Sequence, residues 1–453
     1  MMIDAGSGGS RLHIFRWNPR VFHEVPPPVT IPLNKETWTQ RIAPGVSEFA
    51  DSPKDVVPYL QNLINFAKKE LENCTDNWHF FPLYFKATGG MREVPYVQRE
   101  VLMTQIRDVF FNKTINPFYF QYDFARVISG EEEAAYSWSG ANFLMNSLLP
   151  SSVGSGGSVS TNSTYGTLDL GGASTQIAFF LPSQDISEGL YKLQVGAQRH
   201  WNIYATSYLQ FGFNSARLRF QNDLITNKIA STGSEKVEKN AATTYEKHNA
   251  ITACYYSGYT ENFQYKDANG TVKTYTVSGP KESTADQFDK CYASLEPLLM
   301  KSINKFCNLV YDNQCSIGGS YQPPLPDPKT HKYIGTSSYK YAWNFAQMES
   351  VGSLKEFRRK SKSICNMTFK EAILYRNSIN ATLYAQNGND AYTDSQLPYY
   401  CFLSAYSLLL LQGGYGFPDD TVLQVTNTLN GHKVGWVLGA MLFEINSLPW
   451  VYV

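Results

Sequence analysis

The chain has 453 residues and a mass of 51.1 kDa, which is too much for one ordinary hydrophobic core and predicts two domains. Hydrophobic residues make up 43% and charged residues 17%, a composition that excludes a disordered chain. Lys plus Arg equals Asp plus Glu at 39 each, so the basic excess of a nucleic-acid-binding protein is missing, and we expect no nucleic acid polymer as a partner.

The first predicted element is a β-hairpin at the N-terminus. Ile3 leads to Asp4, a Gly-rich stretch follows, and residues 12–17 alternate as a strand does. A very similar unit recurs at residues 165–180, where an apolar strand carries Asp169 into a Gly-rich turn and a second apolar strand follows. The recurrence predicts an internal duplication with one phosphate-binding turn in each lobe.

Two segments between the hairpins carry further polar motifs. Residues 84–92 (YFKATGGMR) predict a strand that runs into a loop. Residues 128–138 (ISGEEEAAYSW) predict a strand end, a turn and a helix that Ser129 caps, with the three acids 131–133 in its first turn. Stabilising the start of the helix accounts for two of these acids. The Ser/Gly-rich residues 151–163 predict a surface insertion and not a P-loop, because no Gly-Lys-Ser/Thr sequence follows them.

The number and placement of the cysteines indicate in which cellular compartment the protein works. None of the seven forms a Cys-X-X-Cys pair and no His lies at zinc-ligand spacing, so a zinc site is not expected. Six cysteines follow residue 250 and would leave Cys74 free. In chain order they pair as Cys254–Cys291, Cys307–Cys315 and Cys365–Cys401, one of 15 pairings that six cysteines allow. Reduced cysteines buried in a cytosolic core are the alternative. Disulfides would indicate the secretory pathway lumen or the extracellular space.

Glycosylation sequons and hydropathy add to this expectation. Six Asn-X-Thr sequons occur, which fits a glycoprotein, although chance supplies a similar number of Asn-X-Ser/Thr triplets. No apolar stretch approaches the roughly 20 residues that cross a bilayer, and no signal peptide is present. Because an active-site-like motif begins at Asp4, we expect that a targeting segment preceded Met1, and a membrane anchor outside these residues stays open. The sequons begin at Asn73, Asn112, Asn162, Asn269, Asn366 and Asn380.

The motifs together suggest phosphate chemistry. Gly-rich turns present backbone N–H groups that approach phosphate oxygens closely, and two such turns could hold neighbouring phosphates. Asp4 and Asp169 would repel those phosphates, so a bridging Mg²⁺ or Ca²⁺ is expected. An acid within residues 131–133 could act as a general base, a contribution of about 10²–10⁴ in rate. Ser174 and Gln176 could orient the attacking water.

The order of these motifs resembles the apyrase, or nucleoside triphosphate diphosphohydrolase, family over nearly the whole chain. The matching segments are DAGSGGS at 4–10, KATGGMR at 86–92, ISGEEEAAYSW at 128–138, DLGGASTQIAF at 169–179, and, more loosely, GYGFPDD at 414–420 and VGWVLGAML at 434–442. Further similarity appears in WNIYATSYLQFGFNSAR at 201–217, CSIGGSYQPPLP at 315–326 and YYCFLSAY at 399–406. The resemblance implies a nucleotide-binding hydrolase that cleaves nucleoside tri- and diphosphates with Mg²⁺ or Ca²⁺. The three cysteine pairs also match family bridges.

The same resemblance implies an α/β fold of the actin/Hsp70/hexokinase type, with two RNase H-like lobes and the active site in the cleft between them. Lobe I would comprise residues 1–129 and 416–453, and lobe II residues 130–415. Glu133 would be the general base, Ser174 and Gln176 would hold the water, and Asp4 and Asp169 would hold the metal through waters. The phosphates would be surrounded by Ser7, Gly8, Ser10, Thr88, Gly172 and Ala173. Tyr341 and Tyr400 would sandwich the nucleobase.

Two other functions remain open at this point. Another phosphotransferase or an exopolyphosphatase of the same superfamily would share the paired turns, but the neutral charge and the Glu-rich segment disfavour it. A nucleotide-binding ectodomain without catalytic activity would not need Asp4, Glu133, Asp169, Ser174 and Gln176 together. Release of phosphate from nucleotides separates these alternatives.

Overall fold

The computed structural model describes residues 1–453 except 24, 26, 28, 149–163, 183–185, 187, 196–198, 233–248, 268, 301–313, 388–391 and 450. The described chain forms two units. The first consists of Met1–Gly212, Lys329–Ser337 and Thr426–Val453, and the second of Phe213–Pro328 and Ser338–Val425. The first unit thus reaches past residue 129, where the sequence places the end of the first part of lobe I. The lobe boundaries stay a prediction.

Both predicted hairpins form, and each supplies the central strands of a sheet in the first unit. The N-terminal sheet has the order β4-β2-β1-β5-β6, and the other sheet contains the order β14-β7-β8-β10-β9. In both, the central strand (β1 or β7) pairs antiparallel with its hairpin partner and parallel with the strand on its other side. This shared topology supports the predicted duplication. The strands are β1 (Met2–Gly6), β2 (Gly9–His13), β4 (Thr39–Ile42), β5 (Tyr84–Ala87), β6 (Ala125–Val127), β7 (Tyr165–Leu170), β8 (Ser174–Phe180), β9 (Leu190–Val195), β10 (Arg199–Leu209) and β14 (Lys332–Ser337).

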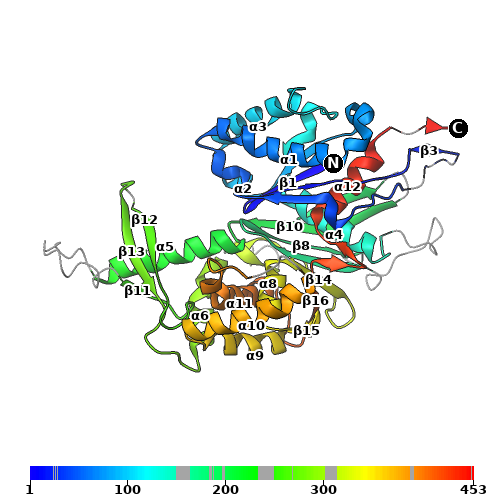
Figure 1. Cartoon of the computed structure of the whole chain (residues 1–453). Helices are drawn as coiled ribbons and strands as arrows, with labels where there is room; N and C mark the ends of the chain where they lie inside the picture. Colours follow the sequence, from blue (N-terminus) through cyan, green and yellow to red (C-terminus); the bar gives the residue numbers. More distant parts are fainter. Residues whose placement is uncertain are drawn as a thin grey trace. The chain divides into compact units, whose positions relative to one another are not determined.

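Helices cover both faces of the N-terminal sheet. Helices α1 (Val56–Glu70) and α3 (Tyr96–Phe111) lie on one face (Figure 1), because their apolar residues recur at helical spacing and share a core with Ile3 and Phe85. Helices α4 (Gly130–Leu144) and α12 (Trp436–Ser447) share another core with Met2 and Tyr84, which belong to the strands of the same sheet. Further core residues of α4 pack on β8 and β10. Helix α4 therefore touches both sheets of the first unit.

The sequence predicts the structure of residues 128–138 correctly and that of residues 84–92 only in part. Ser129 caps α4 as expected, and it forms a capping box in which its side chain accepts from the Glu132 N–H and the Glu132 carboxylate accepts from the Ser129 N–H. After β5, however, the expected loop is a short helix, α2 (Gly89–Glu93). The Met91 and Arg92 N–H groups both donate to the Thr88 carbonyl, and this closes the helical turn. The predicted insertion at residues 151–163 lies outside the described residues.

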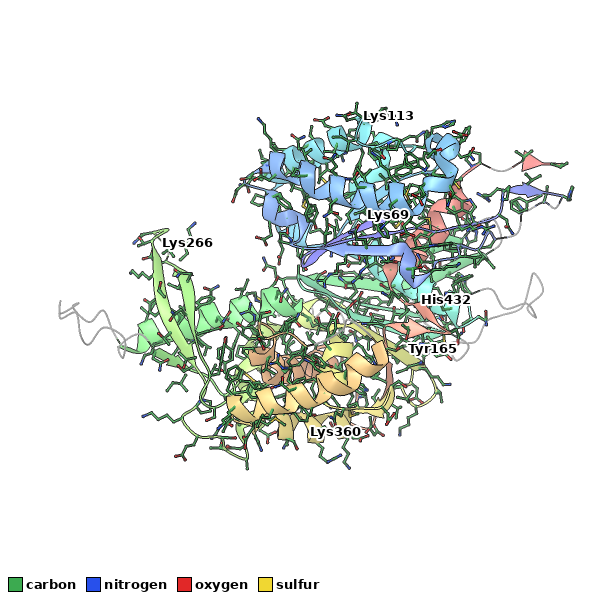
Figure 2. All side chains as sticks on the ribbon, in the orientation of Figure 1. Lys69, Lys113, Tyr165, Lys266, Lys360 and His432 are labelled. Atoms are coloured by element: carbon green, nitrogen blue, oxygen red, sulfur yellow. A yellow bond between two sulfur atoms is a disulfide. The ribbon has the colours of Figure 1, made fainter. Side chains whose placement is uncertain are left out.

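The second unit is mainly helical and carries a β-hairpin. Its helices surround α11, all of whose residues are buried. Long charged side chains lie at the surface of both units, for example Lys113 in the first and Lys266 in the second (Figure 2). The elements are α5 (Phe213–Thr232), β11 (Asn249–Ile251), β12 (Thr260–Lys266), β13 (Val272–Ser278), α6 (Gln287–Leu295), α8 (Ser338–Phe345), β15 (Val351–Ser353), α9 (Leu354–Cys365), α10 (Phe369–Asn387), α11 (Tyr400–Leu409) and β16 (Val422–Val425).

Two of the three predicted disulfides are present. Cys254 is bonded to Cys291 and Cys365 to Cys401, and all four half-cystines are fully buried. Cys74 is a free, exposed cysteine, as expected. The third predicted pair involves Cys307, which lies outside the described residues. Within the described part of the chain, no helix is both long and apolar enough to span a membrane.

Candidate active site

Two carboxylates lie on the central strands of the two sheets in the first unit, and of these Asp169 is buried and Asp4 is partly buried. In the strand register, Asp4 of β1 lies opposite Lys86 of β5, and Asp169 of β7 lies opposite Thr336 of β14. Burial raises the pKa of Asp4 to about 6, the Arg11 cation opposes that shift, and the Asp169 carboxylate adds to it. Burial also raises the pKa of Asp169. Because the Asp169 carboxylate disfavours the ionised form of Asp4, a cation near these two groups would be favourable.

Two glycines of α2 lie in close contact with the two Gly-rich turns. A Cβ at Gly90 would lie 2.8 Å from the Cα of Ser7 in the first turn. A Cβ at Gly89 would lie 2.8 Å from the Oγ of Ser174 and 3.0 Å from the Cβ of Ala173 in the second turn. Neither position has room for a side chain unless its neighbours shift. The KATGG segment thus brings the two turns to one place.

Glu133 projects from the first turn of α4 toward this place. Its side chain is only 9% exposed, and its Oε2 accepts from Nη2 of Arg92 at 2.8 Å. Burial raises the pKa of Glu133 to about 7, the Arg92 cation opposes the shift, and the Asp169 carboxylate adds to it. A carboxyl group whose pKa lies near neutrality can take up a proton during a reaction at physiological pH.

Ser174 and Gln176 form one hydrogen-bonded group with Glu133. The Nε2 of Gln176 donates to the Oγ of Ser174 at 2.7 Å, to the Oγ of Ser207 at 2.9 Å and to the Oε2 of Glu133 at 3.4 Å. Arg92 also donates to the Oγ of Ser174, at 3.0 Å. The buried Oε1 of Gln176 has no hydrogen-bond partner in the described structure, so it is an acceptor for a water.

The predicted phosphate-binding residues follow the same two turns and β5. Thr88 is buried, and its N–H donates to the Ala5 carbonyl at 3.2 Å. Ser10 is buried with an Oγ that has no partner among the described residues, whereas Gly8 is exposed. In the second turn, Gly172 is partly exposed and Ala173 is buried. The structure therefore brings these residues close to Asp4 and Asp169, and their contacts with phosphate stay a prediction.

The two tyrosines expected at the nucleobase lie in the second unit. Tyr341 is 40% exposed, so its ring has a free surface for stacking. Tyr400 is only 3% exposed, and its ring stacks on Phe345 with the centroids 4.0 Å apart. The base sandwich stays a prediction, and Tyr341 is the member with an accessible ring.

Two residues that the motif reasoning left without a role belong to the site. Arg92 ends the KATGGMR segment, and its guanidinium joins Glu133 to Ser174. Ser207 on β10 accepts from Gln176, and its Cβ would lie 2.2 Å from a Cβ at Gly130. The position of Arg92 within a matching segment was a signal for it. Ser207 also lies in a segment that resembles the family, residues 201–217, but only the pairing of β10 with β8 shows that it reaches Gln176.

The residues present fit a divalent cation held through waters. In the described part of the chain, no group of three His, Cys, Asp or Glu side chains could ligate a metal directly. Asp169 nevertheless has a buried Oδ1 without a hydrogen-bond partner in the described structure. An orphaned carboxylate oxygen beside a second carboxylate suits a hard cation that keeps most of its waters. Asp4 and Asp169 are the residues that would hold it.

The chain is similar to known proteins over nearly its whole length. The model of the GDA1/CD39 (nucleoside phosphatase) family matches residues 1–452. Ectonucleoside triphosphate diphosphohydrolase 4 of Homo sapiens is 28% identical, over 99% of this chain and 73% of the relative. The Golgi apyrase of Saccharomyces cerevisiae is 27% identical, over 98% of this chain and 69% of the relative.

A solved structure confirms the fold class. A nucleoside triphosphate hydrolase from Neospora caninum is similar with a TM-score of 0.60 at 14% identity, over 98% of this chain and 92% of that one. This similarity, with the repeated sheet topology, shows the expected actin-like α/β fold with two lobes. Because the family model spans the whole chain but its last residue, this protein belongs to the GDA1/CD39 family of nucleoside phosphatases.

Proposed function

We propose that the protein hydrolyses nucleoside tri- and diphosphates to lower phosphates and inorganic phosphate, with a divalent cation. The observation that carries the proposal is the buried group of Glu133, Ser174 and Gln176, which lies beside both Gly-rich turns. Nucleotide hydrolysis needs no protein nucleophile if a base activates water. The names of the relatives, a triphosphate diphosphohydrolase and an apyrase, agree with this reaction.

Each residue has a role in the proposed reaction. Ser174 and the Oε1 of Gln176 orient a water, and Glu133 takes its proton while the water oxygen bonds to the terminal phosphorus. The bond from that phosphorus to the bridging oxygen breaks, and the electron pair leaves with the shorter nucleotide. Arg92 keeps the Glu133 carboxylate in position. Asp4 and Asp169 would hold Mg²⁺ or Ca²⁺ through waters, and the bound cation would neutralise phosphate charge.

Phosphate release tests the proposal. ATP, ADP, GDP, UDP and AMP are each incubated with the protein in Mg²⁺, Ca²⁺ or EDTA. Release from tri- and diphosphates that EDTA abolishes, with none from AMP, supports the proposal. A protein that binds nucleotides and releases no phosphate under any of these conditions would be a binding module instead.

We also propose that the protein works in the secretory pathway or outside the cell. Two buried disulfides support this, because such bonds persist in oxidising compartments. The names of two relatives, ectonucleoside triphosphate diphosphohydrolase 4 and Golgi apyrase, agree with it. The sequon residues Asn73, Asn112 and Asn269 are exposed and could carry glycans. Protein secreted from eukaryotic cells should therefore migrate faster after treatment with an N-glycosidase, and unchanged migration would count against glycosylation.

A further inference from the structure

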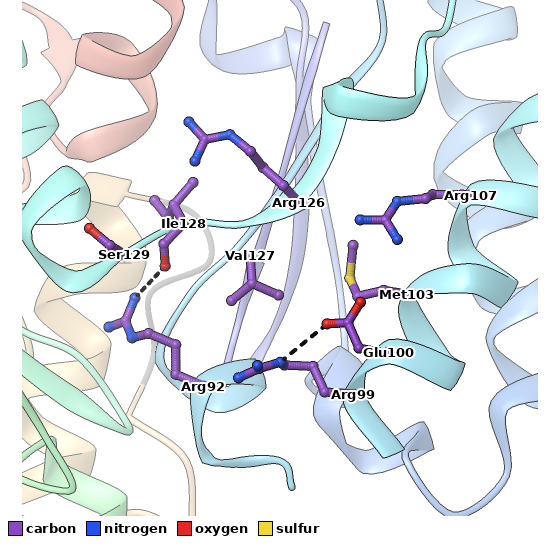
Figure 3. Close-up of a pocket in the computed structure, with 9 residues that line it drawn as sticks. All are labelled: Arg92, Arg99, Glu100, Met103, Arg107, Arg126, Val127, Ile128 and Ser129. Carbon is purple, nitrogen blue, oxygen red and sulfur yellow. Dashed lines mark hydrogen bonds and ion pairs between the residues drawn. The ribbon is translucent and has the colours of Figure 1, made fainter. Parts of the chain in front are cut away.

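A cavity of about 380 Å³ lies in the first unit, between helix α3 and the chain from β6 to the start of α4. Figure 3 shows that arginine side chains reach it from three sides, with Arg99 and Arg107 extending from α3 toward Val127. Glu100 is the only acid among the residues that line it. The lining residues are Arg92, Arg99, Glu100, Met103, Arg107, Arg126, Val127, Ile128 and Ser129.

Two of these arginines keep hydrogen-bond donors for a ligand. Arg107 donates from Nε to the Ala125 carbonyl at 3.2 Å and lies over the Tyr122 ring, and its terminal nitrogens have no hydrogen bond to any described residue. Arg99 forms a long ion pair of 3.6 Å with Glu100, and both side chains are partly exposed. The α3 side of the cavity therefore presents guanidinium groups whose hydrogen-bonding capacity is only partly used.

The other two arginines are bonded to acids that do not line the cavity. Arg126 donates two hydrogen bonds, of 2.8 and 2.6 Å, to Glu132. Arg92 is bonded to Glu133 and also donates to the Ile128 carbonyl in the cavity wall. Four guanidinium groups thus face three carboxylates, and only one of those carboxylates reaches the cavity. The interior surface is positive.

We propose that this cavity is a second anion site that binds free inorganic phosphate. Guanidinium groups are planar forks that match the oxygens of phosphate, and several of them converge here on a space large enough for the anion and bound waters. The apolar walls formed by Met103 and Val127 strengthen the interaction by reducing the local dielectric. The site is separate from the Gly-rich turns, none of whose residues lines it.

Arg92 connects the cavity with the candidate active site. The same guanidinium contacts the cavity wall at Ile128 and the base Glu133. Phosphate in the cavity would attract Arg92 and weaken its hold on Glu133, so the released product would slow further turnover. This consequence rests on the proposed function, whereas binding of the anion does not.

Calorimetric titration of the full chain with inorganic phosphate, in EDTA and without nucleotide, tests the site. Arg99→Gln should weaken binding by roughly tenfold or more, because a charged donor is lost. Glu100→Gln should tighten it by about threefold to tenfold, because the repelling carboxylate is removed. Arg359→Gln is the control, since it removes the same charge from a side chain that is 71% exposed on α9. Thermal unfolding of each variant checks that it is folded.

Opposite shifts in the Arg99 and Glu100 variants, with no shift in the Arg359 variant, support the site. Phosphate affinity that is the same in all four proteins, or absent in the wild type, overturns it. AMP is titrated as well, and AMP binding that depends on Arg99 would overturn the assignment to the free anion. Hydrolysis by the wild type is measured separately, so a protein that hydrolyses ADP but binds no phosphate at Arg99 refutes the second site alone.

Discussion

Replacing Glu133 by Gln should affect activity and stability in opposite directions. Gln keeps the size of the side chain and an acceptor for Arg92, but it cannot take a proton from water. Loss of a general base lowers kcat by about 10²- to 10⁴-fold, or roughly 3–5 kcal/mol in the barrier. Because the base is buried, its ionised form also destabilises the fold. Burial raises the pKa of Glu133 from 4.5 to about 7.

The sign of the stability effect follows from this pKa. A carboxyl whose folded-state pKa is raised contributes stability below its unfolded-state pKa and loses it as the pH rises through the folded-state value. A shift from 4.5 to about 7 corresponds to an upper limit of about 3 kcal/mol at pH 8. Gln resembles the protonated carboxyl, so Glu133→Gln should unfold at a higher temperature than the wild type at pH 8 and at a similar temperature at pH 5.

The neighbouring Glu132 provides the matched control. Glu132 completes the capping box of α4 and pairs with Arg126, which lowers its pKa relative to an ordinary glutamate. Glu132→Gln should therefore cost about 1 kcal/mol of stability and leave phosphate release close to that of the wild type. The assays are phosphate release from ADP and thermal unfolding in EDTA. Full activity in Glu133→Gln, or an equal loss in Glu132→Gln, would refute the assignment of the base.

Three further outcomes are expected. Phosphate release should rise with pH up to about 7 as Glu133 ionises. Arg92→Met should move that rise to higher pH, because the cation that lowers the pKa of Glu133 is gone, and an unchanged pH profile would show that Arg92 does not act on Glu133. Mg²⁺ or Ca²⁺ should raise the unfolding temperature at pH 8, and Asp169→Asn should abolish the increase, which thermal scans with and without EDTA can check. Cys254→Ser should lower stability by up to about 4 kcal/mol through loss of the bond to Cys291, and denaturant titrations that match the wild type would contradict this.

The sequence alone predicts the hairpins and the helix cap because these depend on local rules. A strand that carries Asp into a Gly-rich turn, and a Ser three residues before a Glu, have few other local solutions. The helix α2 was missed for the same kind of reason. Gly89 and Gly90 are poor helix formers, so their presence favours a loop, whereas the structure shows that the close approach of Ser174 and Ser7 leaves no room for a side chain at these positions.

The long-range features of the site were less accessible. Ser207 reaches Gln176 only through the pairing of β10 with β8, which local patterns do not encode. The arginine-lined cavity has the same origin, because Arg99 and Arg107 come from α3 and Arg126 from β6. Tyr400 lies in an aromatic stretch of the chain, and its packing on Phe345 depends on how α8 and α11 meet. Residues whose role depends on tertiary contacts need the fold.

The duplication explains the carboxylates of the site but not its base. Equivalent strands β1 and β7 place Asp4 and Asp169 at equivalent turns, so the proposed cation would have a partner from each repeat. Helices α4 and α12 both pack in one core, yet only α4 has acids in its first turn, whereas α12 begins at Trp436 after Gly435. In the proposed mechanism, a nearly symmetric pair of phosphate-binding turns is therefore combined with a single base. In-line attack on one terminal phosphorus would require this asymmetry, because the water must approach from one defined side.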